Sequence, residues 1–221
     1  MLDLVPRCAL LRFEVPIHFI ARSPRIDGNL TGWTDQYTLP ALSSLEVAAS
    51  ERPFATVRLA WNDDGLFAAF EVTGRRGLPH CETDHWWKYD GVRLLIDTRD
   101  ARENKRATRF CHFFYFLPTG KAGRSAEPIA GTHKMSRAKE PPPAVDLSKI
   151  RVASHVTRGG YTLEAAIPAE CLNGWDPAEH PRIGVCYKVR DTQLGNQFFS
   201  ATDDMGWNAD PSTWATGVLV R

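Results

Sequence analysis

The strongest constraint on this chain is an alternation of apolar and polar residues in short runs that are separated by turn signals. In residues 55–61 apolar side chains occupy every second position, which places them on one face of a strand. Residues 62–65, Asn-Asp-Asp-Gly, suit a hairpin turn because these residue types tolerate its dihedral angles. Similar runs follow at residues 66–72, 91–97, 109–117, 150–156, 161–167, 183–191, 196–202 and 216–221.

This pattern predicts an all-β fold, because no long segment shows the period of a helix. We expect an antiparallel β-sandwich of about ten strands, with a barrel as the related solution. Residues 23–221 would form the sandwich, and residues 1–22 would be an extension able to add an edge strand. Residues 119–149 are rich in Gly, Pro, Lys and Arg and predict a long exposed loop.

The charge balance narrows the class of partner. The chain has 27 basic and 26 acidic residues, a net charge of +1. No large electrostatic field is implied, so we expect neither nucleic acid nor a membrane as partner. The first residues lack the shape of a secretion signal, which predicts a cytoplasmic protein, or an extracellular or periplasmic one if a leader has been removed.

Residues typical of catalytic and metal sites are scattered along the chain. The five cysteines are odd in number and lack CxxC spacing, so we expect no zinc site or redox pair. Asp90 and Asp97 would lie about 23 Å apart along one strand, too far for a glycosidase pair. We expect Asp90 to fix a loop backbone, Asp97 to begin a turn and Glu164 to make a structural hydrogen bond. The sequence therefore names no catalytic residue.

Five segments, in order, resemble the family-9 carbohydrate-binding modules. They are an Ile-Asp-Gly turn followed by a Trp at residues 26–33, a hairpin at 57–67, a Trp-x-x-Asp-x-Val strand at 87–97, a Gly-Tyr strand ending in Ile-Pro at 160–168, and a closing stretch at 207–220. The resemblance implies a sandwich of the immunoglobulin-like DOMON group and a non-catalytic role. It also implies that a mono- or oligosaccharide is the ligand, with a terminal ring clamped between two tryptophans.

The clamping positions match Trp87 and Trp207, and Trp86 could replace its neighbour because adjacent strand residues face opposite ways. The apolar face of a sugar ring stacks on a flat aromatic ring, whereas its hydroxyls need paired donors and acceptors. Both tryptophans lie in polar loops, which suits a ligand platform better than a core position.

Three polar residues complete the candidate site and depart from the family pattern. Arg93 stands where the family has Glu, so an acceptor has become a donor. Lys188 replaces a polar amide, and Asp204 lies where the family can place an Asn. These residues could form a different ligand-binding set or a surface salt bridge of little energetic weight.

Two alternatives remain at this point. The first is a structural or protein-interaction domain that has lost the sugar site, in which the 119–149 loop would cover Trp87 or Trp207. The second is a haem-binding DOMON relative, for which Met135, Met205 and His112 are the available ligands. No cofactor is expected, although calcium is often structural in the family and the chain has Asp-rich loops.

Overall fold

The computed structural model describes residues 14–40, 53–101, 105–120 and 127–221. Its strands are β1 (Glu14–Phe19), β2 (Ala55–Asn62), β3 (Gly65–Thr73), β4 (Gly91–Asp97), β5 (Cys111–Leu117), β6 (Ile129–Thr132), β7 (Arg151–Thr157), β8 (Gly160–Pro168), β9 (Arg182–Asp191), β10 (Gly195–Phe199) and β11 (Ala215–Val220). The 3-10 helices are η2 (Asp35–Tyr37), η4 (Thr83–His85), η6 (Leu147–Lys149), η7 (Ala169–Cys171), η8 (Asp203–Met205) and η9 (Pro211–Thr213). None of the helices in these ranges is long and apolar enough to cross a membrane.

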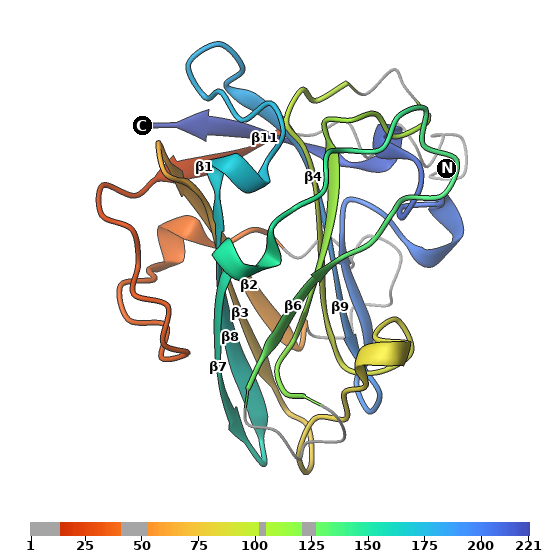
Figure 1. The fold of residues 1–221 in the computed structure, drawn as a ribbon. Coiled ribbons are helices and arrows are strands. Elements are labelled where there is room, and N and C mark those ends of the chain that lie inside the picture. The colour runs from red at the N-terminus through yellow and green to blue at the C-terminus, as the bar shows by residue number, and fades with distance from the viewer. Residues whose placement is uncertain (1–13, 41–52, 102–104, 121–126) are drawn as a thin grey trace, which may run out of the picture.

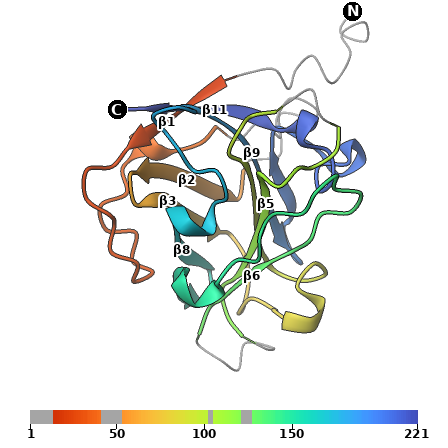
Figure 2. The same ribbon diagram turned by 45° about the horizontal axis from the view of Figure 1, so that its top comes forward.

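The strands form one sheet that folds over on itself. Its order is β6-β5-β4-β9-β11-β1-β2-β3-β8-β7, and β10 pairs with β9. Figure 1 shows β2, β3, β7 and β8 facing β4, β6 and β9, and Figure 2 shows β1 and β11 where the two halves meet. The predicted all-β sandwich is confirmed, in a form that is close to a barrel.

Strand β1 departs from the expected edge strand. It pairs in parallel with β11 on one side and with β2 on the other, so it lies inside the sheet. Its apolar residues explain this position, because Val15 and Ile17 are buried in the core. The remaining strand pairs are antiparallel, so β1 is the parallel exception in an otherwise antiparallel sheet.

The main core lies between the two halves of the sheet. Leu94 and Phe114 project into it from one half, and Leu59, Phe70 and Leu163 project from the other. Leu95 in β4 points the opposite way and joins a second apolar cluster on the outer face. The period-2 geometry of a strand thus lets β4, β5 and β9 supply two apolar layers at once.

Buried Glu164 ties the Ile-Asp-Gly turn to the sheet. Its carboxylate accepts hydrogen bonds from the backbone N–H of Asp27 at 3.0 Å and of Gly28 at 2.5 Å, and from the indole Nε1 of Trp33 at 2.9 Å. Gly28 is required there, since φ is +83° and a Cβ would lie 2.7 Å from the Ser154 backbone. The structural hydrogen bonding expected of Glu164 is confirmed.

The segment 119–149 is more ordered than a simple loop. It contains β6, which pairs with β5, and a buried Met135. Residues 121–126 lie outside the described part. The sequence pattern missed β6 because the strand has four residues and includes Gly131.

We expect Glu164→Ala to lower the free energy of unfolding by about 3 to 5 kcal/mol, because it leaves three N–H donors without their acceptor. Urea unfolding followed by circular dichroism measures the change. The control is Glu170→Ala, which removes an exposed ion pair with Lys149 and should cost less than about 1 kcal/mol. Equal losses in the two variants would contradict this role of Glu164.

Candidate functional site

The candidate site lies on the outer face of β4, β5, β9 and β10. The register aligns Tyr115, Arg93, Lys188 and Phe198 in one row across these strands. Loop residues cover the row and leave a cavity of about 220 Å³. We call this cavity the tryptophan pocket, and its lining residues are Trp86, Trp87, Arg93, Phe113, His133, Lys188, Trp207 and Asn208.

Trp86 is fixed as a wall of the pocket rather than a free platform. Its ring stacks on Tyr115 with centroids 4.3 Å apart and planes only 5° from parallel. Tyr115 in turn lies over Gly131 of β6, where a Cβ would come within 2.1 Å of the tyrosine ring. The small residue in β6 therefore lets Tyr115 support Trp86.

Arg93 holds the loop that carries the tryptophans. Its guanidinium donates to the carbonyls of Gly91 at 2.8 Å, Tyr89 at 3.3 Å and Trp86. The residue is only 2% exposed, and burial lowers the pKa of Arg93 to about 10, so the side chain stays charged at neutral pH. Arg93, which stands where the family has Glu, therefore uses its charge to hold the loop in place.

Trp87 and Trp207 line the same pocket with very different exposure. Trp87 is 56% exposed, whereas Trp207 is 8% exposed and packs against Phe113 and Phe198 with centroids 5.9 and 5.7 Å away. The Trp207 carbonyl also accepts a hydrogen bond from Trp214 Nε1 at 2.7 Å. Trp87 is therefore an open aromatic surface at the rim, and Trp207 is an anchored part of the pocket.

Lys188 makes its ion pair with Asp203. The Lys188 Nζ lies 2.6 Å from the Asp203 carboxylate, which also accepts from Asn196 Nδ2 at 2.9 Å. Burial lowers the pKa of Lys188, although Asp203 acts in the opposite direction. The sequence pointed instead to Asp204, which lies in η8 and whose side chain is outside the described part.

Four further residues at the site were not predicted from the sequence. Asp203 was passed over for its neighbour. Phe113 and Asn208 lie in the predicted strand 109–117 and the closing stretch 207–220, and His133 lies in the predicted loop 119–149. The register of β5 against β4 brings Phe113 to this face, and the His133 backbone N–H donates to the Phe113 carbonyl at 2.9 Å, just beyond β6. Asn208 is brought in by its loop. Of these four residues, only Phe113 could have been found from the alternation of residues along β5.

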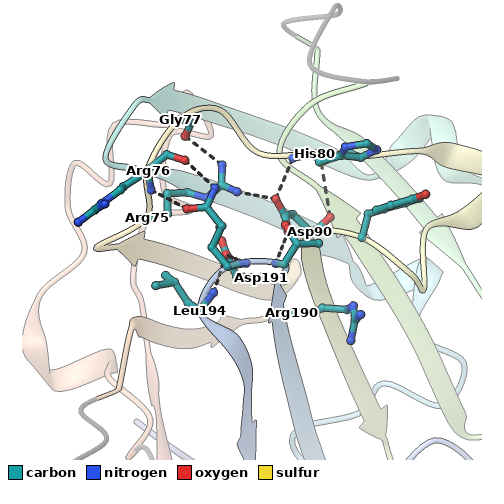
Figure 3. Close-up of polar contacts among 12 residues, drawn as sticks. Arg75, Arg76, Gly77, His80, Asp90, Arg190, Asp191 and Leu194 are labelled. Atoms are coloured by element: carbon teal, nitrogen blue, oxygen red, sulfur yellow. Dashed lines mark hydrogen bonds and ion pairs between the residues drawn. The ribbon is translucent and has the colours of Figure 1, made fainter.

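A buried ion network fixes the loop before β4 against the turn between β9 and β10 (Figure 3). Arg75 lies 2.7 Å from Asp90 and 2.9 Å from Asp191, and all three side chains are almost fully buried. Asp90 also accepts from the backbone N–H groups of His80 and Thr192, at 2.8 and 2.6 Å. The expected role of Asp90 in fixing a loop is confirmed, and this loop carries Trp86 and Trp87 of the tryptophan pocket.

Asp97 begins a turn, as expected, since its carboxylate accepts from the backbone N–H groups of Arg99 and Ala101. The described residues contain no group of three or more His, Cys, Asp or Glu side chains placed to hold a metal ion. The Asp-rich loops bond to nearby N–H groups and cations instead, as in the pair of Asp63 with Arg221.

The residues considered for haem lie on opposite faces of β5. His112 stacks on Phe114, whose ring belongs to the main core, whereas Met135 belongs to the outer cluster and Met205 packs against it. A histidine and a methionine must approach one iron from two sides. The sheet separates these side chains, so the arrangement does not favour a haem site.

A second cavity, of about 330 Å³, lies beside Trp61, Trp175 and Arg221. Trp61 is only 3% exposed, and its indole Nε1 bonds to the Ile17 carbonyl at 2.9 Å. Arg221 lies over the Trp61 ring at 5.4 Å. The ring of Trp61 is thus covered by the protein itself, unlike the ring of Trp87.

The comparisons with known proteins agree with this geometry. The chain matches a family model described as carbohydrate family 9 binding domain-like over residues 26–221. Two solved structures of a family-9 carbohydrate-binding module from Caldicellulosiruptor kristjanssonii share the fold at 16% identity. The match to the complex with cellotriose has a TM-score of 0.64 and covers 94% of this chain and 93% of that chain. The match to the complex with glucose has a TM-score of 0.65 and covers 94% of this chain and 96% of that chain. No curated protein matches this chain significantly.

The fold and the family match define the class, which is that of a non-catalytic binding domain and not an enzyme. Because the family model covers most of the chain, the chain belongs to the carbohydrate family 9 binding-domain-like family. The resemblance noted in the sequence is thereby confirmed.

We expect Arg75→Met to lower the free energy of unfolding by about 3 to 5 kcal/mol, because it leaves the buried charges of Asp90 and Asp191 without their cation. Arg76→Met is the matched control, since Arg76 is the exposed neighbour in the chain. Denaturant unfolding measures both variants. A loss below about 1 kcal/mol for Arg75→Met would contradict the network's role.

A second prediction concerns pH. Burial lowers the pKa of His112 from 6.5 to about 4, although the backbone of Asn173 acts in the opposite direction. Between these pH values the unfolded chain binds a proton that the folded protein does not, so stability falls as pH falls. We expect His112 alone to lower the free energy of unfolding by about 2 to 3 kcal/mol between about pH 7 and about pH 4.5.

Urea unfolding of the protein and of His112→Phe at the two pH values measures this component. The variant should lose less stability on acidification, and His155→Phe is the control because His155 is exposed. An identical pH dependence for the protein and His112→Phe would show that His112 is not held neutral by burial.

Proposed function

We propose that this domain binds carbohydrate without catalysis, with a sugar ring stacked on Trp87 at the mouth of the tryptophan pocket. The observation that carries the proposal is the 56% exposure of Trp87 beside a cavity that also contains Trp207. An exposed indole that is fixed by its loop offers apolar area to the C–H face of a sugar at small entropic cost. Membership of a carbohydrate-binding family supports the same ligand class.

The roles within the pocket follow from the contacts. Trp87 would provide the stacking face, and Trp207 would form the opposing wall, with Trp86 fixed between Tyr115 and the loop. Lys188 and Asn208 would meet hydroxyl groups, and Arg93 would hold the loop in place. The small size of the cavity favours one terminal sugar ring, since pockets for drug-sized ligands measure about 300 to 1,000 Å³.

The glucose and cellotriose complexes of the Caldicellulosiruptor kristjanssonii module support sugars as the first ligands to test. The interaction-domain alternative required Trp87 or Trp207 to be covered by residues 119–149. Trp87 is open among the described residues, and the neighbours of Trp207 include Phe113 and Phe198, which lie outside that segment. The structure therefore gives the sugar-binding proposal more support than the alternative.

We expect a saturable change in tryptophan fluorescence on titration with a panel of mono- and oligosaccharides. Trp87→Ala should weaken binding by about tenfold or more, because it removes the apolar stacking surface. The matched control is Leu78→Ala, since Leu78 is 57% exposed in the same loop and lies outside the pocket. Trp207→Phe tests the opposing wall of the pocket, because it removes the indole and keeps an aromatic ring in the apolar cluster on the outer face.

Unchanged affinity in Trp87→Ala, with binding otherwise intact, would refute the stacking role. The absence of binding to any sugar by the folded protein would refute the proposed function and favour an interaction domain.

A further inference from the structure

The tryptophan pocket is positively charged. Arg93 and Lys188 are its charged lining residues, and no aspartate or glutamate of the described residues lines it. Asp203, which forms an ion pair with Lys188, is not one of the residues that line the pocket. Both charged residues that line the pocket are therefore basic, and Arg190 adds to the positive field that acts on Lys188.

The hydrogen-bonding groups of the pocket are mainly donors. Arginine, lysine and the indoles of tryptophan donate and cannot accept. A neutral sugar presents hydroxyl groups that both donate and accept, so it needs acceptors from its site. Here Asn208 and His133 are the side chains able to accept. A carboxylate, which only accepts, matches this set of donors better than a hydroxymethyl group does.

Lys188 has the position and the free capacity to bind such a group. Its ammonium has three N–H donors, of which Asp203 takes one. The Nζ lies 5.2 Å from the centroid of the Trp207 ring and 4.7 Å from that of Phe198, so it is held beside the aromatic wall. The residue is only 8% exposed, and the low local dielectric strengthens its attraction for an anion. Arg93, whose bonds go to loop carbonyls, contributes positive charge at a fixed place.

We propose that the ligand of this pocket is an acidic sugar, a uronic acid residue whose C6 carboxylate binds Lys188 while its ring stacks on Trp87. This inference rests on the proposed function, because it assigns a ligand class to the same site. The carboxylate would share Lys188 with Asp203, so the two anions compete. Removal of the Lys188 charge should therefore lower the affinity for the uronic acid, and removal of the Asp203 charge should raise it.

The test compares sugars that differ only at C6. Isothermal titration calorimetry of the whole chain at neutral pH uses methyl β-D-glucuronoside against methyl β-D-glucoside, and methyl α-D-galacturonoside against methyl α-D-galactoside. We expect at least one uronoside to bind about tenfold or more tightly than its neutral partner at low salt. This preference should shrink as salt is added, because ions screen the charge interaction.

Variants separate charge from shape. Lys188→Met keeps an apolar chain beside Trp207 and should abolish the preference for the uronoside. Lys149→Met should leave the preference unchanged, because Lys149 does not line the pocket and pairs with Glu170. Asp203→Asn keeps the side-chain shape and should raise uronoside affinity several-fold by freeing Lys188. Because Asp203 is an exposed side chain, this variant remains informative if Lys188→Met does not fold.

The outcomes distinguish the two proposals. Neutral glycosides that bind as tightly as the uronosides, or a uronoside affinity that falls in Asp203→Asn, would overturn the acidic-sugar inference and leave sugar binding intact. A folded protein that binds none of these glycosides and no oligosaccharide would overturn the proposed function itself.

Discussion

Burial of apolar side chains between the two halves of one folded sheet is the constraint on which the rest of this structure depends. In β4 and β9, alternate residues point into that core, and the residues between them point outward. Arg93 and Lys188 face outward because their neighbours Leu94 and Val189 face inward. A shift of one residue in register would exchange the two sets, so core packing also fixes the row on which the tryptophan pocket is built.

The loops over this row are held by buried ionic contacts as well as by aromatic packing. Arg75 bridges Asp90 and Asp191, and Arg93 closes the loop at Trp86 and Tyr89 through their carbonyls. Buried ions are costly to desolvate, which makes a network of one cation shared by two carboxylates sensitive to the loss of any member. Such a network contributes a fixed loop geometry, and fixed geometry reduces the entropy lost when a ligand binds.

Alternation and turn chemistry predicted the fold class and nearly all of the strands, because both signals are local in the chain. Two features of the fold could not be read in this way. The parallel pairing of β1 depends on partners more than 40 residues away, and β6 is too short to show a period. At the site, the tryptophans and Arg93 were found from motif positions, whereas the choice of Asp203 as the partner of Lys188 depends on the path of η8. The burial of Trp207 likewise follows from Phe113 and Phe198, which only the sheet register brings together.

The central claim is that a sugar ring contacts Trp87 and Trp207 in one pocket. The most direct test is a two-dimensional NMR spectrum of the indole N–H groups during titration with a sugar, because the chain has seven tryptophans and only three line the pocket. We predict saturable shifts for Trp86, Trp87 and Trp207, with little change for Trp33, Trp61 and Trp175. Shifts centred on Trp61 and Trp175, or saturable binding that leaves the Trp87 indole unmoved, would contradict the account.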